Sequence, residues 1–248
     1  MSTFTVTKTL APAQFDDYAD TYDSALAQGL ALSGENKSYF TRGRVERLAR
    51  CLPQFADRPT KILDFGCGTG SNAPLFLEQW PDIELLLGVD VSTKSLEVAE
   101  RSFGSARVRF CLNDHYRPDE TFDLVFSNGV FHHIPVAERP GAVDYVRRSL
   151  RLGGLFALWE NNPWNPGTRY VMNRIPFDRD AVPLQPAQAC RVLRASGFHI
   201  LHTEFVFIFP HLLRWLRPLE LRLAKLPIGA QYLVLCRKTS NGVDRRRY

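Results

Sequence analysis

A glycine-rich turn directly after a short apolar run is the feature that most constrains how this chain can fold. From residue 61 the stretch reads KILDFGCGTG, in which Asp64 closes the apolar run and glycines stand at 66, 68 and 70. A helical pattern follows over residues 72–80. A buried strand that ends in a glycine-rich turn and leads into a helix N-terminus is how open α/β sheets hold adenosine-containing ligands. Glycine permits positive φ in such a turn and lets a ligand approach the backbone closely.

The turn alone leaves two ligand classes open. Gly68-x-Gly70-x-x-Ala73 satisfies the dinucleotide fingerprint, which keeps an NAD(P)-dependent oxidoreductase among the candidates. Asp64 favours a different ligand, because a carboxylate at the strand tip repels an anionic pyrophosphate and attracts an ammonium group. The pattern Asp-x-Gly-x-Gly-x-Gly resembles motif I of the class I S-adenosylmethionine-dependent methyltransferases. The resemblance implies S-adenosyl-L-methionine as the cofactor, and it covers residues 61–196 well and both ends loosely.

Strands alternate with helices along the chain, which predicts a doubly wound α/β sheet. The resemblance implies a seven-stranded, mostly parallel, Rossmann-like sheet whose last strand is antiparallel. A single domain is expected over residues 1–248. Its parts are an N-terminal helical lid (1–58), a cofactor-binding core (59–160), an acceptor-site insertion (161–186), C-terminal strands (187–240) with a helical insertion (211–226), and a tail (241–248).

Two further strand ends carry polar residues that suit a nucleoside. The strand 84–90 ends in Asp90, which lies 20 residues past Gly70, about where an acid accepts ribose hydroxyls. Ser92 is a good N-cap for a helix over 93–103. A third strand ends at Asn113-Asp114. This polar pair fits two roles equally well, a contact to the adenine amino group or a surface turn.

The run from Phe122 to Ile134 reads as a buried strand followed by a loop with two histidines. It resembles motif IV of small-molecule methyltransferases, which implies that the backbone around Ser127 and Asn128 holds the methionine end of the cofactor. His132 and His133 then face the acceptor. No metal is expected, because histidines adjacent in a loop rarely converge on one ion and the sequence shows no carboxylate cluster beside them.

The sequence thus yields two sets of candidate residues. The cofactor set is Asp64, Gly66, Cys67, Gly68, Gly70, Asp90, Val91, Asn113, Asp114, Ser127, Asn128 and Tyr22. The acceptor set is Tyr18, His132, His133, Trp159, Glu160, Asn161, Trp164 and Arg169. Tyr18 and Tyr22 belong to an amphipathic helix expected over 11–30, which resembles the lid-entry segment of the family.

The second half of the chain carries less specific signals. A helix is expected over 139–151, ended by Gly153 and Gly154, and then a strand over 155–159. Residues 160–186 hold five prolines and predict an irregular wall of the acceptor site, since this proline density forbids a long helix. A helix over 187–196 and strands over 198–209 and 230–236 complete the sheet.

Residues 211–226 predict an amphipathic helix that Pro218 kinks or splits. At 100° per residue, leucines such as Leu212 and Leu219 fall on one face, and arginines such as Arg214 and Arg222 on the other. Such a helix packs as a lid, forms a homodimer contact, or lies peripherally on a membrane. The first two are favoured over the third.

Composition narrows the setting. The chain has 248 residues and net charge +5, with eleven Lys and Arg against three Asp and Glu from Arg191 onward. This basic end suits an anionic membrane or substrate, whereas no nucleic-acid-binding motif is present. Five widely spaced cysteines, no CxxC pair and no secretory signal favour reduced thiols and a cytoplasmic location.

The expected function is methyl transfer from S-adenosyl-L-methionine to the oxygen or nitrogen of a small molecule, in secondary-metabolite, quinone or lipid biosynthesis. A hydroxyl acceptor needs a base, for which His133 or His132 is the candidate because imidazole titrates near neutrality. The alternatives are an NAD(P)-dependent oxidoreductase, a cofactor-binding protein without catalysis and, among methyltransferases, an enzyme for a lipid-linked acceptor at the membrane surface.

Overall fold

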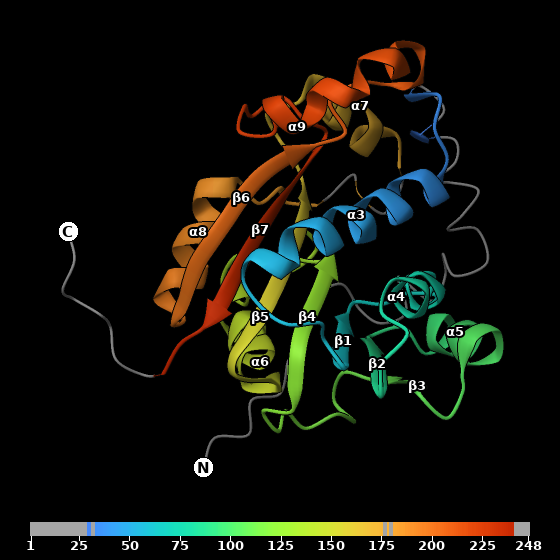
Figure 1. Cartoon of the computed structure of the whole chain (residues 1–248), viewed down its shortest axis with the longest axis vertical. Helices are drawn as coiled ribbons and strands as arrows, with labels where there is room; N and C mark the ends of the chain where they lie inside the picture. The colour runs from blue at the N-terminus through green and yellow to red at the C-terminus, as the bar shows by residue number, and fades with distance from the viewer. Residues whose placement is uncertain (1–28, 31–32, 176–177, 179–180, 241–248) are drawn as a thin grey trace.

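The protein is seen here as a computed structural model that describes residues 29–30, 33–175, 178 and 181–240. Seven strands of this part of the chain form one sheet in the order β3-β2-β1-β4-β5-β7-β6 (Figure 1). Strand β7 pairs antiparallel with both β5 and β6, whereas the other pairs are parallel. The predicted seven-stranded, mostly parallel sheet with an antiparallel last strand is confirmed.

The elements alternate as the sequence predicts. The strands are β1 (Lys61–Phe65), β2 (Leu85–Asp90), β3 (Val108–Leu112), β4 (Phe122–Asn128), β5 (Leu150–Asn161), β6 (Phe198–Val206) and β7 (Gln231–Lys238). The helices are α3 (Lys37–Cys51), η2 (Leu52–Gln54), α4 (Ala73–Gln79), α5 (Thr93–Phe103), α6 (Arg139–Ser149), α7 (Pro166–Arg174), α8 (Pro186–Ala195), η4 (His211–Leu219) and α9 (Glu220–Leu223), of which η2 and η4 are 3₁₀ helices.

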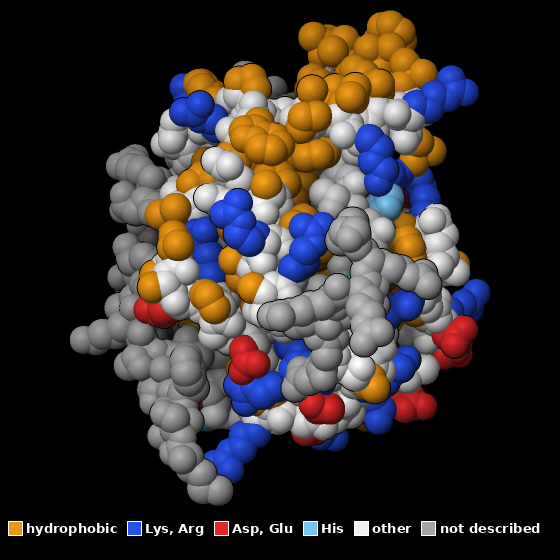
Figure 2. Space-filling view, turned by 90° about the vertical axis from the view of Figure 1, so that its left-hand side faces the viewer, with side chains coloured by type: hydrophobic (Ala, Val, Ile, Leu, Met, Phe, Trp, Pro, Cys, Tyr) orange, Lys and Arg blue, Asp and Glu red, His pale blue; other side chains and the backbone are white. Residues whose placement is uncertain are grey.

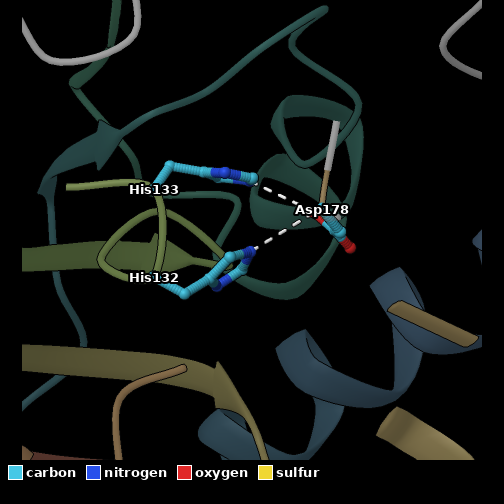
Figure 3. A group of neighbouring side chains, drawn as sticks. All are labelled: His132, His133 and Asp178. Carbon is cyan, nitrogen blue, oxygen red and sulfur yellow. Dashed lines mark ion pairs between the residues drawn. The ribbon is translucent and has the colours of Figure 1, made fainter. Parts of the chain in front are cut away.

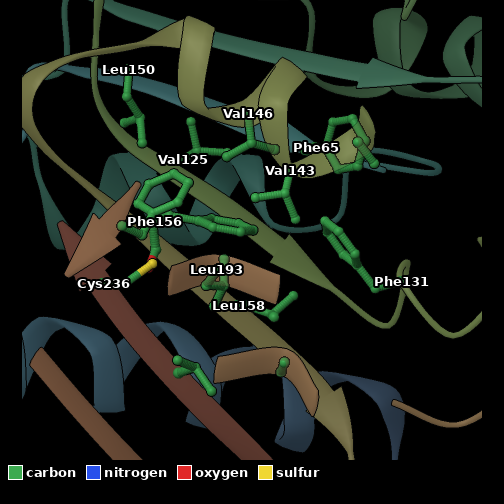
Figure 4. Packing of buried hydrophobic residues seen from close by; sticks show 14 of the residues in the cluster. Phe65, Val125, Phe131, Val143, Val146, Leu150, Phe156, Leu158, Leu193 and Cys236 are labelled. Atoms are coloured by element: carbon green, nitrogen blue, oxygen red, sulfur yellow. The ribbon is translucent and has the colours of Figure 1, made fainter. Parts of the chain in front are cut away.

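Both faces of the sheet are buried, and side chains along each strand alternate between them. On β4, Val125 packs with the cluster that includes α6 and α8, while Leu124 and Phe126 pack with α3 and α4. Figure 4 shows the first cluster, in which Val143 and Leu193 come from the two helices. In Figure 1, α3 crosses one side of the strands and α6 and α8 cover the other. The carboxyl ends of β1, β2, β3 and β4 therefore share one sheet edge.

Helix ends that depend on local signals agree with the structure for the Ser92 cap and for the helix predicted over 187–196. The Asn36 side chain accepts a hydrogen bond from the Tyr39 N–H and begins α3, and Ser92 caps α5 in the same way. Helix α8 ends before Gly197, whose φ of 83° is the left-handed conformation that favours glycine.

The predicted helix over 139–151 is too long, and the role given to its glycines is wrong. Helix α6 ends at Ser149, and β5 already begins at Leu150, which pairs with Phe122. Gly153 and Gly154 lie inside β5, at a shift in its register with β4. A Cβ on Gly154 would lie 3.0 Å from the Phe122 carbonyl oxygen, so this bulge needs a residue without a side chain.

The prediction that 160–186 is irregular is wrong for its middle. Pro166 and Pro176 leave room for the nine-residue helix α7, which Pro166 opens at its first turn, where a missing N–H costs nothing. Asn165 caps this helix by accepting a hydrogen bond from the Thr168 N–H. The Asn162 side chain donates to the carbonyl of Gly229, which ties the segment to the loop before β7.

The single amphipathic α-helix predicted over 211–226 is replaced by η4 and the short α9. Pro218 lies inside η4, next to the junction at Leu219, so the expected interruption is present. Because a 3₁₀ helix turns by 120° per residue, the stripe calculated at 100° does not describe the real surface. The expected lid helix over 11–30 falls almost wholly outside the described residues, and the division into parts stays a prediction.

A buried ion pair fixes α3 to the far edge of the sheet. The Arg47 guanidinium donates two hydrogen bonds to the Glu204 carboxylate on β6, and the Glu204 side chain is 1% exposed. Burial would raise the pKa of Glu204, but hydrogen bonds from Arg47 and His202 outweigh it and lower the pKa to about 2. The ionised pair is therefore a structural part of the fold.

We expect Glu204→Gln to lower the free energy of unfolding by about 3 kcal/mol, because it leaves the Arg47 charge buried without its partner. Urea unfolding at neutral pH measures this. The difference in unfolding free energy between wild type and Glu204→Gln becomes smaller as pH falls below 4.5 towards about 2, because wild-type Glu204 itself becomes protonated there. Glu46→Gln is the matched control, since its pair with Arg50 on α3 is exposed and contributes below about 0.5 kcal/mol. Equal losses of unfolding free energy in Glu204→Gln and Glu46→Gln would contradict the structural role of the Arg47–Glu204 pair.

Candidate functional site

The turn between β1 and α4 brings bare backbone to the carboxyl edge of the sheet. Gly66, Gly68 and Gly70 have φ of 76°, 52° and 75°, so a side chain at any of them would be strained. A Cβ on Gly66 would lie 2.2 Å from Val130, which places this turn against the histidine loop. A Cβ on Gly68 would meet nothing within 4 Å. Gly68 is therefore where the turn is open to a ligand.

Asp64 lies beneath this turn as a buried carboxylate with one unused oxygen. Its Oδ2 accepts a hydrogen bond of 2.9 Å from the Asn72 amide, and its Oδ1 has no hydrogen-bond partner among the described residues. Burial raises the pKa of Asp64 to about 7, the Asn72 hydrogen bond opposes the rise, and the Asp90 charge adds to it. A cationic group at Oδ1 would restore the ionised form.

Asp90 is held at the end of β2 by three backbone donors. Its Oδ2 accepts from the Gly68 N–H at 2.8 Å, and its Oδ1 accepts from the N–H groups of Val91 and Ser92. These contacts connect the glycine turn to the start of α5. The Cys67 side chain is buried and its sulfur lies 2.8 Å from where a Cβ on Gly88 would be, so Cys67 lines the turn with its backbone alone.

Three more polar side chains at this edge have a buried atom without a hydrogen-bond partner in the part of the chain that the structure describes. They are Asn113 Oδ1 after β3, Ser127 Oγ on β4 and Asn128 Oδ1 at its end. The Asn113 carbonyl oxygen is already used, since it accepts from the Tyr145 hydroxyl. The Asp114 side chain is 81% exposed and points to solvent, so of the predicted pair Asn113 is the one at the buried edge.

The two histidines converge on one carboxylate that the sequence interpretation overlooked (Figure 3). His132 Nε2 lies 3.5 Å and His133 Nε2 3.3 Å from Asp178 Oδ1. His132 Nδ1 lies 2.6 Å from Glu160 Oε2, and the other Glu160 oxygen accepts from the Phe131 N–H. The expectation that no carboxylate cluster accompanies the histidines is therefore wrong, because Glu160 and Asp178 both contact them.

The cluster gives its two imidazoles opposite character. Burial disfavours the His132 imidazolium, but the charges of Glu160 and Asp178 outweigh burial and raise the pKa of His132. Burial and the neighbouring His132 charge lower the pKa of His133. The hydrogen bonds from both rings overcome burial and lower the pKa of Asp178. At neutral pH His133 is thus the ring able to accept a proton.

The cluster is also the place where the described residues offer metal ligands. His132, His133 and Asp178 each present one ligand atom, and these atoms lie within 4.8 Å of one another. Asp178 was missed because it stands 45 residues after His133 along the chain, in a segment read only as an irregular wall. Two aspartates two positions apart, Asp178 and Asp180, were the available signal.

The remaining residues expected at the acceptor site are scattered. Trp159 is fully buried in the core beneath α3, and Glu160 contacts His132 rather than open space. Asn161 accepts a hydrogen bond from Gln231. Trp164 is half exposed near Phe205, and Arg169 is exposed on α7. Tyr18 and Tyr22 lie outside the described residues.

Comparisons with known proteins agree with this geometry. A family model described as "Methyltransferase domain" matches residues 62–154, which span β1 to the start of β5. A malonyl-acyl-carrier-protein O-methyltransferase of Acetivibrio thermocellus is 31% identical over 128 residues, 49% of this chain and 44% of that protein. A trans-aconitate 2-methyltransferase of Rhodopseudomonas palustris strain HaA2 is 34% identical over 143 residues, 55% of this chain and 51% of that protein.

Among solved structures, the Burkholderia thailandensis 1,6-didemethyltoxoflavin-N1-methyltransferase, bound to S-adenosylhomocysteine, has a TM-score of 0.60 at 20% identity. The alignment covers 96% of this chain and 94% of that one, which shows the shared fold. The chain spans about half the length, or less, of the curated relatives described above. Residues 62–154 thus match a methyltransferase domain, and the sheet has the fold of S-adenosylmethionine-dependent methyltransferases.

Proposed function

We propose that this protein transfers a methyl group from S-adenosyl-L-methionine to a small-molecule acceptor. The observation that carries the proposal is a set of buried atoms along one sheet edge, from Asp64 Oδ1 to Asn128 Oδ1, that have no hydrogen-bond partner among the described residues. A buried polar atom without a partner costs about 1–3 kcal/mol, so a row of them next to an open glycine turn fits a polar ligand. The family match and the named relatives support the choice of ligand.

The residues at this edge fit the parts of that cofactor. Asp64 Oδ1 is placed for the ammonium of the amino-acid tail, and the open backbone at Gly68 leaves room beside it. Asp90 is the candidate for the ribose hydroxyls, Asn113 for the adenine, and Ser127 and Asn128 for the methionine end. When bound, the sulfonium supplies an activated methyl group. The protein aligns the acceptor atom with the methyl–sulfur bond and excludes water.

The acceptor side is assigned to the loop after β4. Val130 contacts the glycine turn, and His132 and His133 follow it directly, so the acceptor reaches the loop next to the cofactor cradle. The location of this reaction in the cytoplasm stays a prediction, as does a homodimer.

We expect S-adenosylhomocysteine to raise the melting temperature and NAD(H) to leave it unchanged. At a hundredfold excess over the dissociation constant the ligand adds about 2.7 kcal/mol, which corresponds to a rise of roughly 5–10 °C for a domain of this size. A shift with NAD(H) alone would instead support the oxidoreductase.

Asp64→Asn should lower the affinity for S-adenosylhomocysteine by about tenfold to a hundredfold, because a charge-assisted hydrogen bond is lost. The wild-type affinity should rise with pH through about 7, since Asp64 must ionise to pair with the ammonium. Titration calorimetry from about pH 5.5 to 7.5 keeps the ligand ammonium largely charged. Asp82→Asn, on the surface before β2, is the control. A pH dependence that survives in Asp64→Asn would contradict this role.

We expect His133→Ala to lower turnover by about 10²- to 10⁴-fold while affinity for S-adenosylhomocysteine changes by less than about twofold. The reason is that His133 lies on the acceptor side of the cradle. The assay uses labelled S-adenosyl-L-methionine and a panel of hydroxyl and amine acceptors. His199→Ala removes an exposed imidazole on β6 as control. Unchanged turnover in His133→Ala would contradict the assignment of His133 as the general base. If the wild type forms no product with any acceptor, a cofactor-binding protein without catalysis is favoured.

A surface around η4 and α9 favours an acceptor presented at a membrane. Its exposed apolar residues are Leu212, Leu213, Trp215, Leu219, Leu221, Leu226 and Ile228. Figure 2 shows hydrophobic side chains gathered at the top of the molecule, with Lys and Arg side chains close by. Exposed apolar side chains next to basic ones are typical of proteins that lie on anionic lipid. No helix of the described residues is long and apolar enough to span a membrane.

We expect the protein to co-sediment with vesicles that contain anionic phospholipid, and less with neutral vesicles or at high salt. Trp215→Glu should weaken this binding, because Trp215 is 72% exposed on the apolar surface. Val136→Glu is the control, since Val136 is 62% exposed in the loop before α6. Absence of binding to either vesicle, or equal losses in both variants, would leave the acceptor a water-soluble molecule.

A further inference from the structure

The cluster of His132, His133 and Asp178 has the composition of a transition-metal site. Two imidazole nitrogens and one carboxylate oxygen, with other positions open, form the facial arrangement of many non-haem iron sites, and catalytic zinc uses a similar set. The close-up in Figure 3 shows both rings directed at the Asp178 carboxylate. Adjacent histidines seldom share a target, so their convergence needs an explanation.

The spacing of the atoms fits an ion between them. Metal–nitrogen and metal–oxygen bonds of about 2.0–2.1 Å place neighbouring ligand atoms roughly 3.3 Å apart around a tetrahedral ion. Asp178 Oδ1 lies 3.3 Å from His133 Nε2 and 3.5 Å from His132 Nε2. All three ligand atoms lie within 4.8 Å of one another.

The surroundings hold these groups in place. Glu160 Oε2 contacts His132 Nδ1 at 2.6 Å, the arrangement in which a carboxylate fixes a metal-binding imidazole through its other nitrogen. Glu160 is itself fixed by the Phe131 N–H and is fully buried. The His132 carbonyl accepts from the Val182 N–H at 3.0 Å, which joins the histidine loop to the segment that carries Asp178.

The charges of the cluster also favour a cation. Glu160 has Arg139 as a charged neighbour, and that guanidinium is anchored on the carbonyls of Ile134 and Val182. Among the described residues, the Asp178 side chain pairs with the two imidazoles. Glu160 and Asp178 place two buried carboxylates beside the imidazoles, and a cation coordinated by His132, His133 and Asp178 would balance their charge after His132 releases its proton.

We propose that His132, His133 and Asp178 bind one divalent transition-metal ion, such as Zn²⁺, Mn²⁺ or Fe²⁺, that coordinates an oxygen of the acceptor. Imidazole ligands select these ions over Mg²⁺ and Ca²⁺. The ion lies next to the cofactor cradle, because Val130 in the same loop contacts Gly66. It would hold the acceptor oxygen and lower the pKa of its hydroxyl group, whose proton would pass to solvent water before methyl transfer. In this state His133 Nε2 donates its lone pair to the metal, and the metal replaces His133 as the group that activates the oxygen.

The test is a direct measurement of metal binding by the full chain after removal of metal with a chelator. Titration calorimetry with Zn²⁺ should give one site per chain, and Co²⁺ should give a visible absorption band of the bound ion. Mg²⁺ should not compete. Asp178→Asn and His133→Gln should abolish the site, and Glu160→Gln should weaken it by about tenfold to a hundredfold. His199→Gln is the control, since its imidazole is exposed on β6.

Every outcome is informative. The proposal is overturned if the wild type binds no Zn²⁺. It is also overturned if Asp178→Asn and His133→Gln bind Zn²⁺ as the wild type does. In either case the contacts of the two rings with Asp178 are hydrogen bonds. Circular dichroism checks that each variant is folded, and an unfolded Asp178→Asn leaves His133→Gln to decide. Because the titration contains neither S-adenosylmethionine nor acceptor, its failure leaves the proposed methyl transfer intact. Failure of cofactor binding would likewise leave the metal site standing.

Discussion

The candidate site depends on one close approach between two backbone segments. A Cβ on Gly66 would lie 2.2 Å from Val130, so only a residue without a side chain lets the turn after β1 meet the loop after β4. This contact sets the cofactor cradle beside His132 and His133, although the two segments are more than sixty residues apart in sequence. Parallel pairing of β1 with β4 brings both strand ends to the same edge and makes the contact possible.

Several buried side-chain atoms that lack a hydrogen-bond partner among the described residues gather at that edge. Elsewhere, buried charges are paired internally: Lys238 donates to the Leu150 carbonyl, and Glu204 is held by Arg47. At the edge, Asp64 and Ser127 each keep an unpartnered buried atom. Two clusters of apolar side chains, one on each face, stabilise the sheet and offset the cost of these groups. The stability of the sheet thus allows a polar edge that a ligand completes.

The sequence predicted most of what local patterns control. Glycine spacing and caps such as Ser92 predicted the β1 turn and the start of α5, because both depend on neighbours in sequence. The antiparallel β7 came from the family resemblance. Gly153 and Gly154 were misread, because a left-handed glycine after a helix and one in a bulge look alike until the pairing of β5 with β4 is known. Helix α7 was missed because proline density hid the gap between Pro166 and Pro176.

Asp178 illustrates what the sequence could not provide. Asp64 and Asp178 are both buried aspartates at the same edge, yet their surroundings give them opposite character. Beside an amide and another carboxylate, burial dominates and raises the pKa of Asp64 to about 7, so it ionises fully only when a cation arrives. Two imidazoles at Asp178 overcome burial and lower its pKa, so it is already the anion that orients them. The low pKa of Asp178 arises from contacts with histidines that stand about 45 residues earlier in the chain, and the sequence alone does not show these contacts. One carboxylate therefore suits a ligand that comes and goes, and the other holds a fixed assembly of side chains.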